Sequence, residues 1–216
     1  METGNIKKSI AELIVQDKYP DALIECGKAL KESPSDSEII SVIKFLFSRI
    51  QDAHYDFTPK SAEEYTLRGI ARYYNEELED ALADYDKAIT KDGTYDYAFK
   101  CRHLVNAALG KIDDAIQDIQ TSIELNPTGE YFNDFGTLCG IIRKSKEAVA
   151  HYQKAVEISP NIPQFWYNFG CELMDQGQWK AAVQKFDKAI ELWPKYDDAL
   201  HNRKYILDKF PDLSGY

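Results

Sequence analysis

The sequence predicts an all-α protein built from repeated helical hairpins. A set of aromatic, glycine, alanine and proline residues recurs at intervals of roughly 34 residues. Between these landmarks, apolar side chains follow helical i, i+3, i+4, i+7 spacing, as in the segment 181–192. Glycine and proline stand where such helices would have to end, as at Gly177 and Pro194. A period of this length indicates hairpins that stack and bury one apolar face against the next.

The recurring residues are clearest towards the C-terminus. One copy reads Trp166, Phe169, Gly170, Ala182, Phe186, Ala189 and Pro194. The preceding copy reads Phe132, Phe135, Gly136, Ala148, Tyr152, Ala155 and Pro160. In each copy the alanines leave room for a neighbouring helix, and the glycine permits close approach inside the hairpin. Agreement at a fixed period is more specific than any single motif.

This pattern resembles the tetratricopeptide repeat family, whose consensus runs W-x2-L-G-x2-Y, then A-x3-F, then P. The resemblance divides the chain into repeats at 62–95, 96–128, 129–162 and 163–196. The repeat at 96–128 is eroded, because Arg102 and His103 replace the large apolar residue and the glycine. The resemblance implies an α-α superhelix, that is, a right-handed solenoid whose first helices line a concave groove.

Both ends of the chain are expected to add helices to the repeats. Residues 1–57 contain a degenerate hairpin followed by one helix over 37–52, whose segment 39–50 is apolar nearly all round. Such a helix needs burial on more than one side, against the N-terminal hairpin and the repeats. The segment 52–61 is the expected joint, with Thr58 or Ser61 capping the next helix. Residues 197–210 form the expected C-terminal capping helix.

Composition argues against several classes of function. Twenty-six basic residues against 36 acidic ones give a net charge of -10, which disfavours nucleic acids and anionic membranes as partners. No apolar stretch is long enough to suggest membrane insertion. Four scattered cysteines indicate reduced thiols and a cytoplasmic location. The histidines are equally scattered, so neither a metal site nor another cofactor is expected.

No pattern of catalytic residues is recognisable, and the chain is not expected to be an enzyme. Cys171 beside Glu172 lacks a nearby histidine in the sequence, so it is interpreted as a packed thiol. An enzyme-associated subunit is the least favoured alternative. The acidic segment 76–86 is interpreted as the solvated face of a helix, with a docking patch for a basic partner as the alternative.

Placing the sequence on the geometry of the family assigns fourteen residues to the concave face. They are Thr66, Ile70, Tyr73, Tyr74, Tyr97, Lys100, Leu104, Asn133, Thr137, Ile141, Gln164, Tyr167, Asn168 and Cys171. The core does not obviously require Ile70, Tyr73, Tyr97, Leu104 and Tyr167, because it has aromatic residues of its own. Exposed apolar residues and tyrosines in one strip are typical of recognition surfaces.

The expected function is therefore that of a non-catalytic adaptor whose groove binds a peptide or helix of a partner protein. One subclass of the family clamps the acidic tails of heat-shock chaperones with lysine, arginine and asparagine. Here Leu104 and Asp134 occupy clamp positions, and Asp134 would repel a carboxylate, so that subclass is rejected. The alternatives are an assembly or secretion-type chaperone, or a self-associating scaffold. The latter would dimerise through residues 39–50 or the C-terminal helix.

Overall fold

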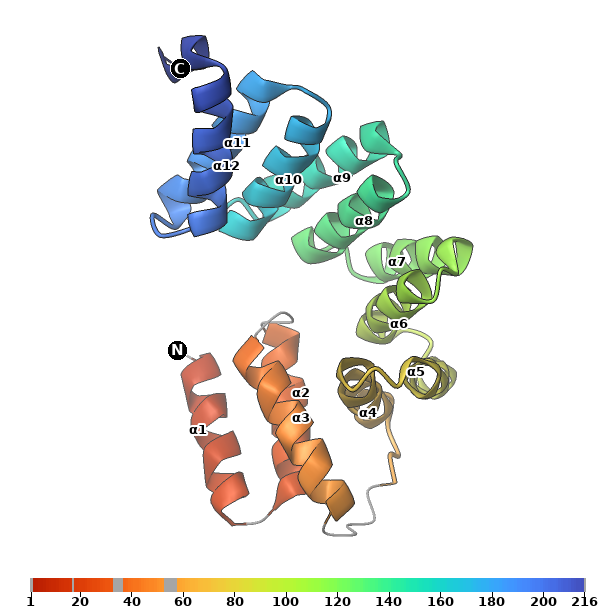
Figure 1. Ribbon diagram of the computed structural model, residues 1–216. Coiled ribbons are helices and arrows are strands. Elements are labelled where there is room, and N and C mark those ends of the chain that lie inside the picture. The colour runs from red at the N-terminus through yellow and green to blue at the C-terminus, as the bar shows by residue number, and fades with distance from the viewer. Residues whose placement is uncertain (1, 17, 33–36, 53–57, 216) are drawn as a thin grey trace. The chain divides into compact units, whose positions relative to one another are not determined.

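A computed structural model describes residues 2–16, 18–32, 37–52 and 58–215. These residues form twelve α-helices and one short 3-10 helix, so the predicted all-α class is confirmed (Figure 1). The helices are α1 Glu2–Val15, α2 Tyr19–Glu32, α3 Ser37–Asp52, α4 Ala62–Tyr74, α5 Leu78–Lys91, α6 Asp96–Ala108, α7 Ile112–Leu125, α8 Gly129–Ile141, α9 Ser145–Ile158, α10 Pro163–Asp175, α11 Trp179–Leu192 and α12 Asp197–Lys209, followed by η1 Pro211–Gly215.

The chain divides into two compact units, which we call unit 1 (Met1–Asp118) and unit 2 (Ile119–Tyr216). The division falls inside α7. In unit 1, α1 pairs with α2 and α4 pairs with α5; in unit 2, α8 pairs with α9 and α10 with α11. Helix α12 then packs against α11. The predicted helical hairpins are therefore present in both units.

Each hairpin from α4 onward turns through a residue in the left-handed region of backbone conformation. These residues are Glu76, Gly110, Arg143 and Gly177, with φ of 66°, 74°, 60° and 70°. The next backbone N–H closes the turn: that of Gln178 donates to the Leu173 carbonyl at 2.9 Å, and that of Glu77 to the Arg72 carbonyl at 2.9 Å. The left-handed turn expected at Gly177 is confirmed. Glu76 and Arg143 adopt the same conformation with a Cβ, which costs about 1 kcal/mol.

Inside the hairpins, a glycine of the first helix faces an aromatic ring of the second. A Cβ on Gly170 would lie 2.6 Å from the Phe186 ring, and one on Gly69 would lie 2.5 Å from the Tyr85 ring. The close approach expected at Gly170 is confirmed. The repeat at 96–128 departs from this rule, because His103 stands at the glycine position.

A second contact inside each hairpin joins residues that are sixteen positions apart, and its chemistry changes between repeats. Arg68 meets Asp84 with Nη2 and Oδ1 2.6 Å apart, and Arg102 meets Asp118 at the same distance. In unit 2, each corresponding pair contains a phenylalanine ring. The Phe135 ring stacks on His151 at 4.0 Å between centroids, and the Lys185 ammonium lies 4.8 Å from the Phe169 ring centroid.

The interpretation of the acidic segment 76–86 as a solvated face holds for five of its six acidic residues, which are exposed, and is wrong for Asp84. Asp84 has no exposed surface, and its carboxylate accepts hydrogen bonds from Arg68 and from Arg72. Asp86 pairs with Arg102, Nη1 to Oδ1 at 2.7 Å. In the sequence, a turn separates these aspartates from the arginines that bind them, so helical spacing within 76–86 does not predict the ion pairs.

Helix α3 occupies the place that the sequence predicted for an apolar helix over residues 37–52. It contacts both α2 and α4 (Figure 1). Ile39, Ile43 and Leu46 are almost completely buried, whereas Phe45 remains 44% exposed. The expectation of burial on more than one side is therefore confirmed. Residues 53–57 of the predicted joint lie outside the described residues, and Ser61, one of the two expected caps, accepts the Glu64 N–H at 3.2 Å.

Candidate functional site

Unit 1 contains a small cleft lined by residues of helices α3, α4, α5 and α6, which we call the tyrosine cleft. Its volume is about 30 Å³. Six of the seven groove residues predicted for this part of the chain surround it. They are Ile70, Tyr73, Tyr74, Tyr97, Lys100 and Leu104. The seventh, Thr66, lines no part of the cleft: it is 1% exposed, and its hydroxyl donates to the Ala62 carbonyl at 2.8 Å.

The expectation that the core does not require these side chains is wrong for several of them. Ile70 and Tyr97 are 5% and 8% exposed and belong to the main hydrophobic core of unit 1, against which Tyr73 also packs. Lys100 is likewise buried. The physical reason is α3, whose Ile40 forms one wall of the cleft. Tyr74, at 39% exposed, is the cleft residue that offers the most surface to a ligand.

Two lysines place positive charge beside the tyrosines. The Lys44 ammonium lies 5.4 Å from the centroid of the Tyr74 ring, and that of Lys100 lies 5.6 Å from the Tyr97 ring. Burial raises the pKa of the Tyr74 phenol above its usual value, while the nearby Lys100 charge acts in the opposite direction. The tyrosine cleft therefore combines aromatic surface with positive charge in a chain whose net charge is -10.

In unit 2, polar side chains of α8 and α10 form a continuous chain of hydrogen bonds, which we call the amide row. The Asn168 amide donates to the Asn133 side-chain oxygen at 3.0 Å, and the Gln164 amide donates to the Asn168 oxygen at 2.9 Å. The Tyr196 hydroxyl donates to the Gln164 side-chain oxygen. Three predicted groove residues thus meet in one network. Asn133 is buried, Asn168 half-buried and Gln164 exposed, so the network runs from the core to the surface.

Helix α12 and the turn before it partly enclose two other predicted residues. The Tyr167 ring lies 5.0 Å from the Tyr196 ring, and the Asn202 amide contacts the Tyr167 hydroxyl at 3.4 Å and Cys171 Sγ at 3.7 Å. The expectation that the core does not need Tyr167 is therefore incorrect, because its ring also packs 5.9 Å from that of Phe186. Sequence reasoning missed Tyr196 and Asn202, although Asn202 follows Asn168 by one repeat length.

The last two predicted groove residues, Thr137 and Ile141, are not members of the amide row. The Thr137 hydroxyl donates to the Asn133 carbonyl at 3.1 Å and shares a hydrogen bond of 3.1 Å with the Tyr152 hydroxyl. Ile141, at the end of α8, is 69% exposed.

For three of the four cysteines, burial opposes activation of the thiol as a nucleophile. Burial raises the pKa of the Cys171 thiol, and it raises that of Cys139 to about 11 and that of Cys26 to about 12. All four cysteines are free thiols. Within the described ranges, no three His, Cys, Asp or Glu side chains are grouped so that they could hold a metal ion. None of the helices described is long and apolar enough to cross a membrane.

Comparison with known proteins identifies the repeats. Tetratricopeptide repeat families match residues 130–162 and 151–184. Human tetratricopeptide repeat protein 13 is 27% identical over 135 residues, which cover 62% of this chain and 16% of the relative. The human protein O-mannosyl-transferase TMTC3 is 27% identical over 109 residues, covering 50% of this chain and 12% of the relative. The chain therefore spans less than a fifth of the length of either relative.

Two solved structures share the fold. The crystal structure of YrrB, a tetratricopeptide repeat protein with an unusual peptide-binding site, has a TM-score of 0.56 and 24% identity, with 76% of this chain and 82% of YrrB covered. That of TTC0263 from Thermus thermophilus has a TM-score of 0.63 and 16% identity, with 95% and 98% covered.

Proposed function

Because this chain is a tetratricopeptide repeat protein, we propose that it is a non-catalytic adaptor that binds a peptide or helix of a partner protein. Tetratricopeptide repeats generally serve as protein-interaction modules. Fold alone does not identify a ligand, so the proposal depends on the surface that this sequence builds on the frame. The peptide-binding site of YrrB is consistent with such a role.

The observation that carries the proposal is the convergence of the predicted groove residues of α4 and α6 on the tyrosine cleft. Tyr73, Tyr74 and Leu104 are only partly buried there, beside the buried Lys100. Tyrosine combines a large apolar ring with a polar tip and is enriched at recognition sites. At about 30 Å³ the cleft is too small to enclose a whole side chain, so the partner would lie across its rim and insert only the tip of one apolar group.

The amide row offers a second point of attachment. Asparagine and glutamine amides can both donate to and accept from a peptide backbone, irrespective of its side chains. The hydrogen bonds that link Asn133, Asn168 and Gln164 hold these amides in fixed orientations, which reduces the entropy lost on binding. We assign the selectivity of binding to the tyrosine cleft of unit 1, and the amide row of unit 2 is by itself suited to contacts with a peptide backbone.

The test is a Tyr74→Ala variant. Tyr97 is unsuitable because it is part of the core, and its truncation would lower stability together with binding. Tyr74 is 39% exposed, and Ile158, a residue of α9 with 41% exposure, provides a matched control. Partners captured from the native source by the wild-type chain should be lost with Tyr74→Ala and retained with Ile158→Ala. If the two variants capture the same partners as the wild type, the tyrosine cleft is not the binding surface.

Self-association through residues 39–50 receives less support. Ile39, Ile43 and Leu46 of this segment are buried within unit 1, which leaves Phe45 as the exposed large apolar residue among the side chains described there. We therefore favour binding of a different protein.

A further inference from the structure

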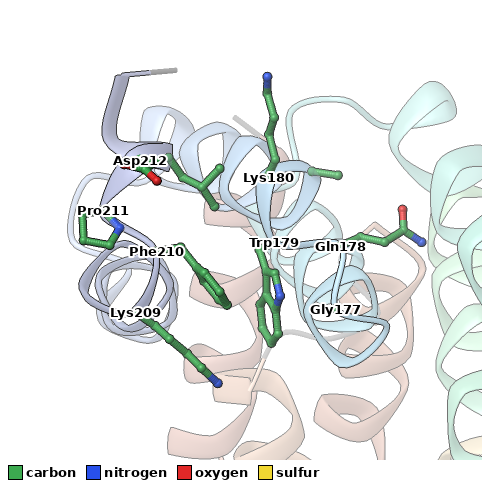
Figure 2. Close-up of a pocket in the computed structure, with 10 residues that line it drawn as sticks. Gly177, Gln178, Trp179, Lys180, Lys209, Phe210, Pro211 and Asp212 are labelled. Carbon is green, nitrogen blue, oxygen red and sulfur yellow. The ribbon is translucent and has the colours of Figure 1, made fainter.

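A separate pocket of about 640 Å³ lies at the C-terminal end of unit 2, and we call it the C-terminal pocket. It is bounded by the first turn of α11 and by the end of α12 with η1 (Figure 2). Its volume falls in the range of pockets that bind small molecules or single anchoring side chains of a peptide. It shares no residue with the tyrosine cleft or the amide row.

The floor of the pocket is aromatic. Trp179 and Phe210 lie with their ring centroids 5.1 Å apart, and both rings are half-buried. Trp179 is the first residue of α11, and the corresponding first residues of α5, α7 and α9 are Leu78, Ile112 and Ser145. The hairpins therefore form without an indole at this position. At Trp179 the indole packs on Phe210, which follows α12.

The segment after α12 completes the pocket. Phe210 ends the helix, and η1 then turns the chain, with the Leu213 N–H donating to the Phe210 carbonyl at 3.0 Å. This turn places Leu213 among the lining residues as a further apolar group. The pocket is thus made by a specific local structure, in which the 3-10 helix closes one side.

Positive charge borders this apolar floor. The Lys209 ammonium lies 5.3 Å from the Trp179 ring centroid and 5.7 Å from that of Phe210. Lys180 lies on another side of the pocket, as Figure 2 shows, and Asp212 supplies a carboxylate. The first turn of α11 contains no acidic residue, so the positive end of its dipole adds to the lysine charges. The local charge is thus opposite in sign to the net charge of -10 of the whole chain.

We propose that the C-terminal pocket binds an acidic segment of a partner protein in which a large apolar side chain lies next to carboxylates. The apolar side chain packs on Trp179, Phe210 and Leu213, and the carboxylates face Lys180 and Lys209. Charge complementarity selects this ligand over a basic segment, because a basic segment would meet two ammonium groups. The proposal adds a second docking site to the adaptor and is independent of binding at the tyrosine cleft.

The test uses the full chain and three fluorescent synthetic peptides, in measurements of fluorescence anisotropy. The first peptide has the sequence Glu-Asp-Phe-Leu-Glu, the second replaces its acids with lysine, and the third replaces Phe-Leu with Ala-Ala. The first should bind with a dissociation constant on the order of 0.1 mM, and the other two at least about tenfold more weakly. Raising the ionic strength from about 0.05 M to about 0.5 M should weaken binding several-fold.

Matched charge reversals on α12 locate the binding. Lys209→Glu should weaken binding of the first peptide by about tenfold, whereas Lys204→Glu, an exposed lysine of α12 outside the pocket, should change it by less than about twofold. Trp179→Ala, with helicity checked by circular dichroism, should abolish binding. Tyr74→Ala should leave it unchanged, so a failure here is separable from a failure of the proposed adaptor site.

Three results would overturn the proposal. One is the absence of binding at about 1 mM of the first peptide, because the dissociation constant would then be far higher than that of a specific docking site. Another is equal weakening by Lys209→Glu and Lys204→Glu, which would indicate only the general field of the chain. The third is a concentration-dependent dimer that Trp179→Ala abolishes, since the occupant would then be a second copy of the chain.

Discussion

The pH dependence of stability should be controlled by His103, and a His103→Leu variant tests this. His103 is 2% exposed, and neither ring nitrogen has a hydrogen-bond partner. Burial, reinforced by the charge of Lys100, lowers its pKa from 6.5 to about 4, while the charge of Asp118 acts in the opposite direction. The folded chain therefore holds this imidazole neutral at pH values where the unfolded chain protonates it.

The sign and size of the effect follow from linkage. Because the folded pKa is depressed, the unfolded state binds more protons between pH 6.5 and pH 4, and stability falls as the pH falls through this window. At about 1.4 kcal/mol per pH unit, roughly 2 kcal/mol should be lost between pH 7 and pH 5, and about 3 kcal/mol by pH 4. Leucine has a similar volume and does not titrate. His103→Leu should therefore be close to the wild type at pH 7 and about 2 kcal/mol more stable at pH 5.

The assay is urea denaturation of the full chain at pH 7 and pH 5, with hydrogen exchange of the α6 amides to localise the effect. His201, which is exposed on α12, provides the matched control, and His201→Leu should retain the wild-type pH dependence. His151 also has a lowered pKa caused by burial, so His103→Leu should keep a smaller residual slope. The reasoning is refuted if His103→Leu loses as much free energy of unfolding between the two pH values as the wild type does.

Two further predictions concern the hairpins. Asp84→Asn should lower the free energy of unfolding by about 3 kcal/mol, because it leaves two arginines without their buried carboxylate. Asp86→Asn, at a side chain that is 56% exposed, should lower it by less than about 1 kcal/mol. If urea denaturation shows similar losses for the two variants, burial of the carboxylate is not the cause. Glu76→Gly should raise stability by about 0.5–1 kcal/mol by relieving a left-handed residue, whereas Gly177→Ala should lower it by about 1 kcal/mol; melting temperatures that move in the opposite directions would contradict this explanation of the turns.

The sequence predicts the scaffold well because the scaffold depends on local rules. Helical spacing identifies α11, a glycine that must turn the chain identifies the loop at Gly177, and the close approach at Gly170 follows from the consensus of the repeat. The bounds of α3 coincide with the predicted helix over 37–52. Each of these features is determined by residues within one hairpin or one helix.

The candidate site is harder to predict because it depends on which element covers a given face. The resemblance to the family places Ile70 and Tyr97 on the inner face of the first helices, but it contains no information on the position of α3. Once α3 lies against α4, these two side chains are core residues that also line the cleft, and Tyr74 is left exposed. Likewise, the sequence places Tyr167 in the groove, yet contacts from Tyr196 and Asn202 partly enclose it.

The contact between residues sixteen positions apart shows how the same frame accommodates different chemistry. In the hairpins that begin with α4 and α6, the contact joins an arginine to an aspartate. In those that begin with α8 and α10, it joins a phenylalanine to a histidine or a lysine. Each solution is complementary within its own pair, so exchanging one member alone buries an unpaired charge or mismatches a ring. Arg68→Phe combined with Asp84→Lys, which copies the Phe169 and Lys185 pair, should therefore lower the free energy of unfolding less than Asp84→Lys alone does. Because Arg72 also depends on Asp84, this rescue should be incomplete, and the shortfall measures the contribution of Arg72 to the network.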